Sequence, residues 1–114
     1  MTLLRNATMS SHAFLKDMYA DGFYPDELVR QCEEILRDLC REIEAQQPAN
    51  LAALYALTHA ATERLNDMQD AFAEQESEIE TGAREAFGAD FETIAHAYGF
   101  ADADVEELIA PRDW

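Results

Sequence analysis

The feature that most constrains the fold is an unbroken apolar stripe within residues 25–46. Apolar side chains recur there at steps of three, four and one residues, the repeat of one face of an α-helix. Pro25 suits the first turn of such a helix, and the acids after it lie at the positive end of the helix dipole. We therefore predict one long amphipathic helix, whose stripe consists of Leu28, Val29, Cys32, Ile35, Leu36, Leu39, Cys40 and Ile43.

A second apolar seam predicts another long helix over residues 50–75. Asn50 is a favourable N-cap for it, since its side chain can accept a hydrogen bond from a free backbone N–H group. The two helices are joined by the short connection QQPA. They are therefore expected to lie side by side as an antiparallel hairpin.

Glycine and proline divide the rest of the chain into shorter helices. These are predicted over residues 11–20, 78–87, 91–98 and 105–110, with Gly22, Gly88, Gly99 and Pro111 as the stop signals. No segment shows the two-residue alternation of a β-strand. The chain is expected to be all-α: one domain over residues 10–114, with five or six helices built on the hairpin of about 25–46 and 50–75. Residues 1–9 are expected to be a frayed terminus.

The cysteines and the hydropathy pattern indicate a cytoplasmic protein. Cys32 and Cys40 are eight residues apart on the long helix, so their Cα atoms lie about 12 Å apart, too far for a disulfide. Both fall on the apolar stripe and are expected to be buried thiols rather than reactive ones. No apolar run is long enough for a membrane span or a signal peptide. We expect no interaction with membranes.

The stretch SEIETGARE, residues 77–85, has the pattern of a helix start. Ser77 followed three residues later by Glu80 matches a capping box. Arg84 stands four residues after Glu80, the favourable order for an ion pair on a helix. Gly82 is unexplained by this pattern, since glycine inside a helix costs about 1 kcal/mol relative to alanine. We expect some group to approach Gly82 closely, and a neighbouring helix is favoured over a ligand or partner.

The chain carries a net charge of −16, and most of the excess lies in its second part. Residues 1–65 hold ten acids and six bases, whereas residues 66–114 hold fourteen acids and two bases. Such a field repels nucleic acids and membrane surfaces and speeds association with basic proteins. The predicted interaction surface comprises Glu76, Glu78, Glu80, Glu85, Asp102, Asp104, Glu106, Glu107 and Trp114.

Two functions follow from this charge. One is an inhibitor or immunity-type protein that covers a basic protein partner, and the other is a mimic of nucleic acid. The alternative is an acidic domain whose charge only maintains solubility.

Two further features leave alternatives open. Trp114, the single tryptophan, could pack on the body of the protein or be a free handle for a partner. The apolar stripe of residues 28–43 is wide enough to face a second copy as well as its own core, so a homodimer is an alternative to a monomer.

Two histidine–glutamate pairs are the candidates for metal binding or catalysis. His59 and Glu63 are four residues apart, as are Glu92 and His96, so each pair shares one face of a helix. Zinc accepts imidazole and carboxylate ligands. Di-iron bundles instead use Glu-x-x-His, which the chain lacks. Ordinary helix-surface pairs are therefore favoured, and a metal-binding or catalytic bundle that uses these four residues is the alternative function.

No sequence pattern indicates a cofactor. DADVEE, residues 102–107, begins like a calcium loop but has Glu107 where an EF-hand needs glycine. No glycine-rich phosphate loop occurs, and no nucleophile and base can be paired from their spacing. We expect no cofactor, and the sequence gives an enzymatic function no support.

Four segments resemble a family of small bacterial proteins classed only as a domain of unknown function. They are FLKDMYADGFYPDELV, LYALTHAATERLND, SEIETGARE and AYGFADADVEELIAPRDW. The resemblance covers nearly the whole chain from about residue 14 onward. It implies a compact bacterial protein of one domain. It does not bring an established activity, ligand or catalytic residue. It also implies that the family pattern includes Tyr19, His59, Glu63, Glu78, Glu80, Glu85, Arg112 and Trp114.

Overall fold

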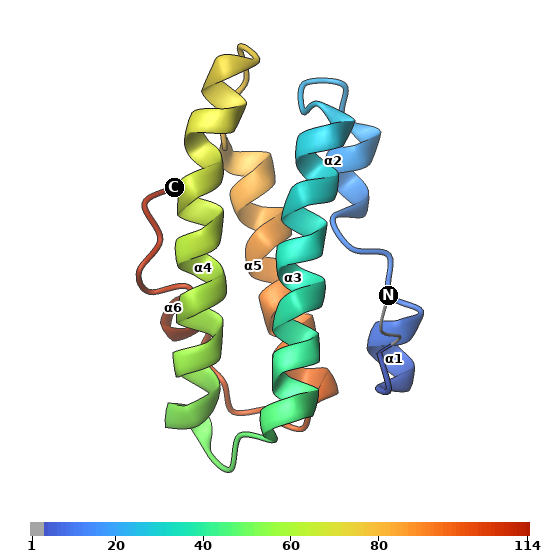
Figure 1. Ribbon diagram of the computed structural model, residues 1–114, viewed down its shortest axis with the longest axis vertical. Helices are drawn as coiled ribbons and strands as arrows, with labels where there is room; N and C mark the ends of the chain where they lie inside the picture. The colour runs from blue at the N-terminus through green and yellow to red at the C-terminus, as the bar shows by residue number, and fades with distance from the viewer. Residues whose placement is uncertain (1–3) are drawn as a thin grey trace.

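In the computed structural model, which describes residues 4–114, two long antiparallel helices form the frame of the molecule (Figure 1). They are α3, Asp26–Gln46, and α4, Leu51–Glu74. The Asn50 side chain caps α4 by accepting a hydrogen bond from the Ala53 N–H group at 2.9 Å. Gln47 ends α3 in a left-handed conformation, with φ of 48°, and turns the chain toward α4. The predicted hairpin is confirmed.

A third long helix, α5, Thr81–Ala97, lies behind this hairpin in Figure 1, and the short α6, Val105–Leu108, packs beside α4 and α5. The prediction of separate helices over residues 78–87 and 91–98 is wrong, because α5 continues through Gly88. Phe87, Phe91 and Ile94 are fully buried along α5. Their packing outweighs the cost of about 1 kcal/mol for a glycine within a helix.

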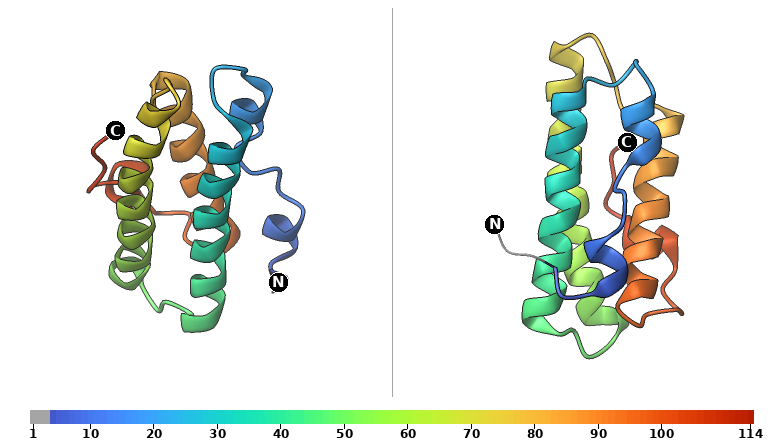
Figure 2. Two further views of the ribbon diagram at one scale, coloured as in Figure 1. Left: turned by 45° about the horizontal axis from the view of Figure 1, so that its top comes forward. Right: turned by 90° about the vertical axis from the view of Figure 1, so that its right-hand side faces the viewer.

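The N-terminal segment runs along the outside of the bundle and carries two short helices, α1, Ala7–Ser10, and α2, Lys16–Ala20 (Figure 2). The helix predicted over residues 11–20 is shorter than expected because Leu15 has left-handed backbone angles, with φ of 53°, just before α2. Within the stretch expected to be frayed, Met9 is fully buried and Asn6 caps α1. Residues 1–3 lie outside the described part of the chain.

The core contains the whole apolar stripe of α3, since all eight of its residues are buried. Cys32 and Cys40 are free, buried thiols, and burial raises the pKa of each to about 12. They are therefore protonated at neutral pH, as expected of structural cysteines. Over residues 4–114 the chain has six helices and no strand, so the all-α prediction is confirmed. In the same range, no helix combines the length and hydropathy needed to cross a bilayer.

Candidate functional site

The eight acidic residues of the predicted interaction surface are all exposed, but they form two groups at the two ends of α5 (Figure 1). At about 1.5 Å per residue, α5 separates these groups by about 24 Å. The first, the tip group, lies between α4 and α5 and in the first turns of α5. The second, the α6 group, lies in and just before α6. The tip group is Glu76, Glu78, Glu80 and Glu85, and the α6 group is Asp102, Asp104, Glu106 and Glu107.

The connection that carries the tip group is not the capping box predicted from SEIETGARE. α5 begins at Thr81, with Glu80 at the N-cap position and without a side-chain cap. Ser77 is buried, and its hydroxyl donates a hydrogen bond to the Phe23 carbonyl at 3.1 Å. The capping-box prediction is therefore wrong, because a contact between segments distant in sequence uses the Ser77 hydroxyl. This contact also fixes the tip group against the turn before α3.

Gly82 lies in the first turn of α5, and the prediction of a close neighbour there is confirmed. A Cβ atom at this position would be 3.2 Å from the hydroxyl of Tyr24. That hydroxyl accepts a hydrogen bond at 3.1 Å from the Ala83 N–H group, one of the donors that a helix leaves free in its first turn. The neighbour is thus a buried tyrosine from the turn before α3, rather than a helix or a ligand.

An exposed aromatic side chain lies beside the tip group. Phe23 is 42% exposed and is the one large hydrophobic side chain that is exposed within residues 4–114. Its ring contacts the ring of Tyr24 edge to face, with centroids 5.2 Å apart. The pKa of Glu80 is raised, chiefly by a hydrogen bond with the Glu78 carboxyl and further by the charge of Asp21. Phe23 is therefore next to a crowded group of carboxylates.

No lysine or arginine within residues 4–114 forms an ion pair with the tip group, and the pair expected between Glu80 and Arg84 is not formed. The α6 group has more internal contacts. Asp104 caps α6 through the Glu106 N–H group at 3.0 Å, and Glu106 pairs with Arg112 at 3.2 Å. The tip group consequently has the more available negative charge.

Trp114 is packed on the body of the protein and is only 8% exposed. Its ring contacts Phe87 edge to face, with centroids 5.1 Å apart. The Asn66 amide holds the adjacent tail, donating to the Pro111 carbonyl at 3.0 Å and accepting from the Asp113 N–H group at 2.8 Å. Of the two alternatives for Trp114, the structure shows the packed one, which removes Trp114 from the interaction surface.

The structure does not assemble the candidate metal ligands. His59 Nε2 lies 2.6 Å from the Glu107 carbonyl oxygen, to which it can donate, and its ring is parallel to that of Tyr55. Glu63, Glu92 and His96 are exposed on α4 and α5. Within residues 4–114, no three His, Cys, Asp or Glu side chains converge on a position that could hold a metal ion.

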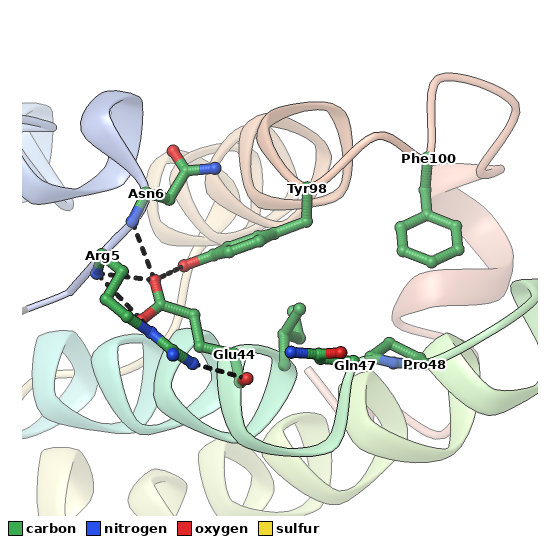
Figure 3. A pocket seen from close by; sticks show the side chains of 8 residues that line it. Arg5, Asn6, Glu44, Gln47, Pro48, Tyr98 and Phe100 are labelled. Carbon is green, nitrogen blue, oxygen red and sulfur yellow. Dashed lines mark hydrogen bonds and ion pairs between the residues drawn. The ribbon is translucent and has the colours of Figure 1, made fainter.

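A cavity of about 430 Å³ opens where the ends of α3 and α5 approach the N-terminal segment (Figure 3). Tyr98 and Phe100, from the segment after α5, stand on two sides of the hollow. The C-terminal end of α3 and the following turn form its floor, and Glu44 closes the side toward the N-terminal segment. The lining residues are Arg5, Asn6, Ile43, Glu44, Gln47, Pro48, Tyr98 and Phe100.

Glu44 is the central polar residue of this cavity, with a side chain only 10% exposed. Its carboxylate accepts hydrogen bonds from the Arg5 and Asn6 N–H groups at 2.9 and 3.0 Å and from the Tyr98 hydroxyl at 2.5 Å. Burial alone would raise the pKa of Glu44, but these hydrogen bonds outweigh it and lower the pKa. Burial and the bond to Glu44 raise the pKa of Tyr98, so Tyr98 is a neutral donor to an ionised carboxylate.

Sequence reasoning missed both Glu44 and Asp90. Asp90 is 7% exposed and accepts hydrogen bonds at 2.9 Å from His12 Nε2 and from the Leu15 N–H group. A signal was present for Asp90, because it lies three residues after Phe87 and therefore on the buried face of α5. An acid on such a face needs a partner.

The fold and the sites define a small all-helical protein with an exposed acidic surface. The chain belongs to the family of unknown function DUF5713, whose family model matches residues 8–114. Comparisons with curated proteins and with solved structures gave no match. The resemblance seen in the sequence is thus confirmed at the level of the family, and it brings no activity with it.

Proposed function

We propose that the protein acts by binding a basic protein through the acidic surface of its C-terminal half. The observation that carries this proposal is the exposure of all eight carboxylates in the two acidic groups, of which Glu106 alone forms an ion pair within residues 4–114. Carboxylates without local cations produce a field that reaches into solvent over about a Debye length. That field accelerates encounter with a basic surface.

The tip group is the favoured centre of the interface because Phe23 lies beside it. Binding energy at protein interfaces is concentrated in a few well-placed residues, often aromatic, within a polar rim. Phe23 rests on Tyr24, whose hydroxyl is fixed by the Ala83 N–H group, and its own carbonyl is held by Ser77. A rigid base of this kind lowers the entropy lost when a partner covers the aromatic ring.

The proposal has two forms, an inhibitor or immunity-type protein and a mimic of nucleic acid. Both use exposed carboxylates against cations on the partner, but only the mimic occupies a surface that otherwise holds phosphates. Double-stranded DNA should therefore compete with this protein for the partner if it is a mimic. An inhibitor that covers another surface should bind equally well with and without DNA.

The test begins with capture from a lysate of the source organism on the immobilised protein, eluted with a salt gradient. A retained basic protein is then purified, and its affinity for two charge-matched variants is measured. The tip variant carries Glu76→Gln, Glu78→Gln and Glu80→Gln, and the control carries Asp102→Asn, Glu107→Gln and Asp113→Asn. We expect the tip variant to lose about tenfold in affinity at low salt, and the control about threefold or less.

Addition of Phe23→Ala to the tip variant should weaken binding further, and this loss should persist at high salt because an apolar contact is not screened. Equal losses for the two charge variants would contradict the role of the tip group. Retention of no specific basic protein would leave solubility as the role of the charge and overturn the proposal.

A further inference from the structure

We propose that the cavity between Tyr98 and Phe100 receives the cationic side chain of a lysine or arginine from a protein partner. This site lies at the other end of α5 from the tip group, and Asp102 of the α6 group follows its lining residue Phe100 by two positions in the chain. The inference shares with the proposed function the expectation of a basic partner. The test of the cavity needs no partner protein. The cavity proposal and the proposed function can therefore fail independently of each other.

The first argument is the combination of aromatic rings with an ionised carboxylate. Rings of tyrosine and phenylalanine attract cations through their faces, and pockets built from such rings bind ammonium groups. Tyr98 donates its hydroxyl hydrogen to the Glu44 carboxylate, which makes its ring richer in electrons. Phe100 also lines the hollow, on the right in Figure 3. A cation in the hollow would be close to two aromatic side chains, with the Glu44 carboxylate at the hydroxyl end of Tyr98.

The second argument is the shape and lining of the cavity. Its volume of about 430 Å³ lies within the range of ordinary ligand pockets and exceeds what a single long side chain fills. Ile43 and Pro48 give it apolar walls, which suit the aliphatic stem of lysine or arginine. The Gln47 side chain, exposed at the rim, adds a polar group for the charged end.

The third argument concerns Arg5, the cation that already lies near Glu44. Its Nε atom is 3.4 Å from the Glu44 carboxylate, and Nη2 donates to the Glu44 carbonyl at 2.7 Å. Figure 3 shows Arg5 on the far side of Glu44 from Phe100, so the space between the rings is not occupied by this guanidinium. The Arg5 side chain is 70% exposed, so water and salt screen its charge. Its repulsion of a second cation in the cavity is therefore weak.

The test uses tripeptide probes and chemical-shift titration of the full chain by NMR. The probes are acetyl-Gly-Lys-Gly-amide, its arginine counterpart, and a counterpart with norleucine, which has a similar apolar stem to lysine and no charge. We expect saturable shifts at residues 97–101, with the lysine and arginine probes binding about tenfold more tightly than the norleucine probe. Equal affinity for norleucine, or no saturable shift at these residues, would overturn the proposal.

Two substitutions link this preference to the cavity. Phe100→Leu keeps an apolar wall and removes the ring, so the lysine preference over norleucine should fall from about tenfold to about threefold or less. Phe23→Leu, at the opposite end of the molecule, is the matched control and should leave the preference unchanged. If the Phe100→Leu variant still prefers the lysine probe over the norleucine probe by about tenfold, the preference comes from the overall negative charge of the protein. That result would contradict a cation site in the cavity.

Arg5→Gln provides a measurement that does not depend on an altered aromatic wall. The Arg5 and Asn6 N–H groups still hold Glu44 in this variant, and only the resident guanidinium is removed. Binding of the lysine probe should become about two- to threefold tighter, whereas that of norleucine should not change. Weaker lysine binding in Arg5→Gln would contradict the proposed arrangement. Because the probes are peptides, a positive result stands even if no basic protein is captured by the tip group.

Discussion

The acids of α3 and those of the C-terminal half have very different surroundings. On α3, Glu33 accepts from Arg37 Nε at 2.7 Å, and Asp38 pairs with Arg64 from α4 at 3.1 Å. In residues 66–114, the pairs formed within the described chain are Glu106 with Arg112 and the buried Asp90 with His12. Residues 1–65 offset much of their acidic charge by placing bases one helical turn away on α3 or on the facing helix α4. Most acids of residues 66–114 therefore have no cation beside them within the described chain.

A second difference separates buried acids from exposed acids. Glu44 and Asp90 each accept hydrogen bonds from backbone N–H groups of the N-terminal segment and so hold that segment on the bundle. The tip group makes no comparable contact with N–H groups of another segment among residues 4–114. The same residue type therefore holds two segments together in one region and is exposed to solvent in another. Substitutions can separate these two roles.

The largest effect is expected for Glu44→Ala. It leaves the exposed Arg5 N–H group and the half-buried Asn6 N–H group and Tyr98 hydroxyl without their acceptor. We expect the free energy of unfolding to fall by about 2–4 kcal/mol, measured by urea denaturation. Glu78→Ala, an exposed acid of the tip group, is the control and should change it by about 0.5 kcal/mol or less. Similar values for the two variants would remove the distinction between structural and available acids.

A smaller effect is expected for Gly82→Ala, at the contact between the tip group and the turn before α3. The new Cβ atom would be 3.2 Å from the Tyr24 hydroxyl, which is buried and bonded to Ala83. We expect a loss of about 1 kcal/mol in the free energy of unfolding despite the better helix propensity of alanine.

The Tyr24→Phe background tests the cause, because it removes the hydroxyl that the new atom meets. Gly82→Ala should then stabilise the protein by about 0.5–1 kcal/mol, as helix propensity alone would predict. A double-mutant cycle measures this reversal. An equal loss in both backgrounds would show that backbone conformation, and not Tyr24, requires glycine at this position.

The sequence was sufficient to predict the hairpin because its evidence is local. The stripe of α3 repeats with the helix period over about four turns, and all of its members are buried. Stop signals were less reliable: Gly88 does not end α5, because the aromatic residues around it are buried against other elements. Ser77 failed as a capping residue for the same reason, since its partner, the Phe23 carbonyl, lies 54 residues away in the chain.

The candidate sites also differ in how far the sequence could predict them. Exposure of the acidic residues follows from composition, and the sequence predicted it for all eight. The cavity at Glu44 joins Arg5 to a residue 39 positions away and Tyr98 to a residue 54 positions away. No periodicity within one helix contains that information, because the N-terminal segment and α5 meet α3 only in the folded chain. Metal ligands chosen by spacing alone failed to converge within residues 4–114 for the same reason.

The smallest expected effect is a difference in the pH dependence of stability between the two kinds of acid. The lowered pKa of Glu44 means that its contribution is present above the ordinary value of 4.5 and is lost as the pH falls through the folded-state pKa. The raised pKa of Glu80 has the opposite sign, because the folded protein disfavours its ionised form. Ionisation of Glu80 therefore lowers stability as the pH rises past 4.5.

Urea denaturation of the wild type, Glu44→Gln and Glu80→Gln between pH 7 and pH 4 measures both signs. The advantage of the wild type over Glu44→Gln should shrink toward pH 4, because protonation removes the charge that the Arg5 and Asn6 N–H groups and Tyr98 favour. Glu80→Gln should be slightly more stable than the wild type at pH 7 and equal to it at pH 4. Equal behaviour of the two variants would mean that Glu78 and its surroundings do not disfavour the ionised form of Glu80, and the contrast between a stabilising acid at Glu44 and crowded acids in the tip group would be lost.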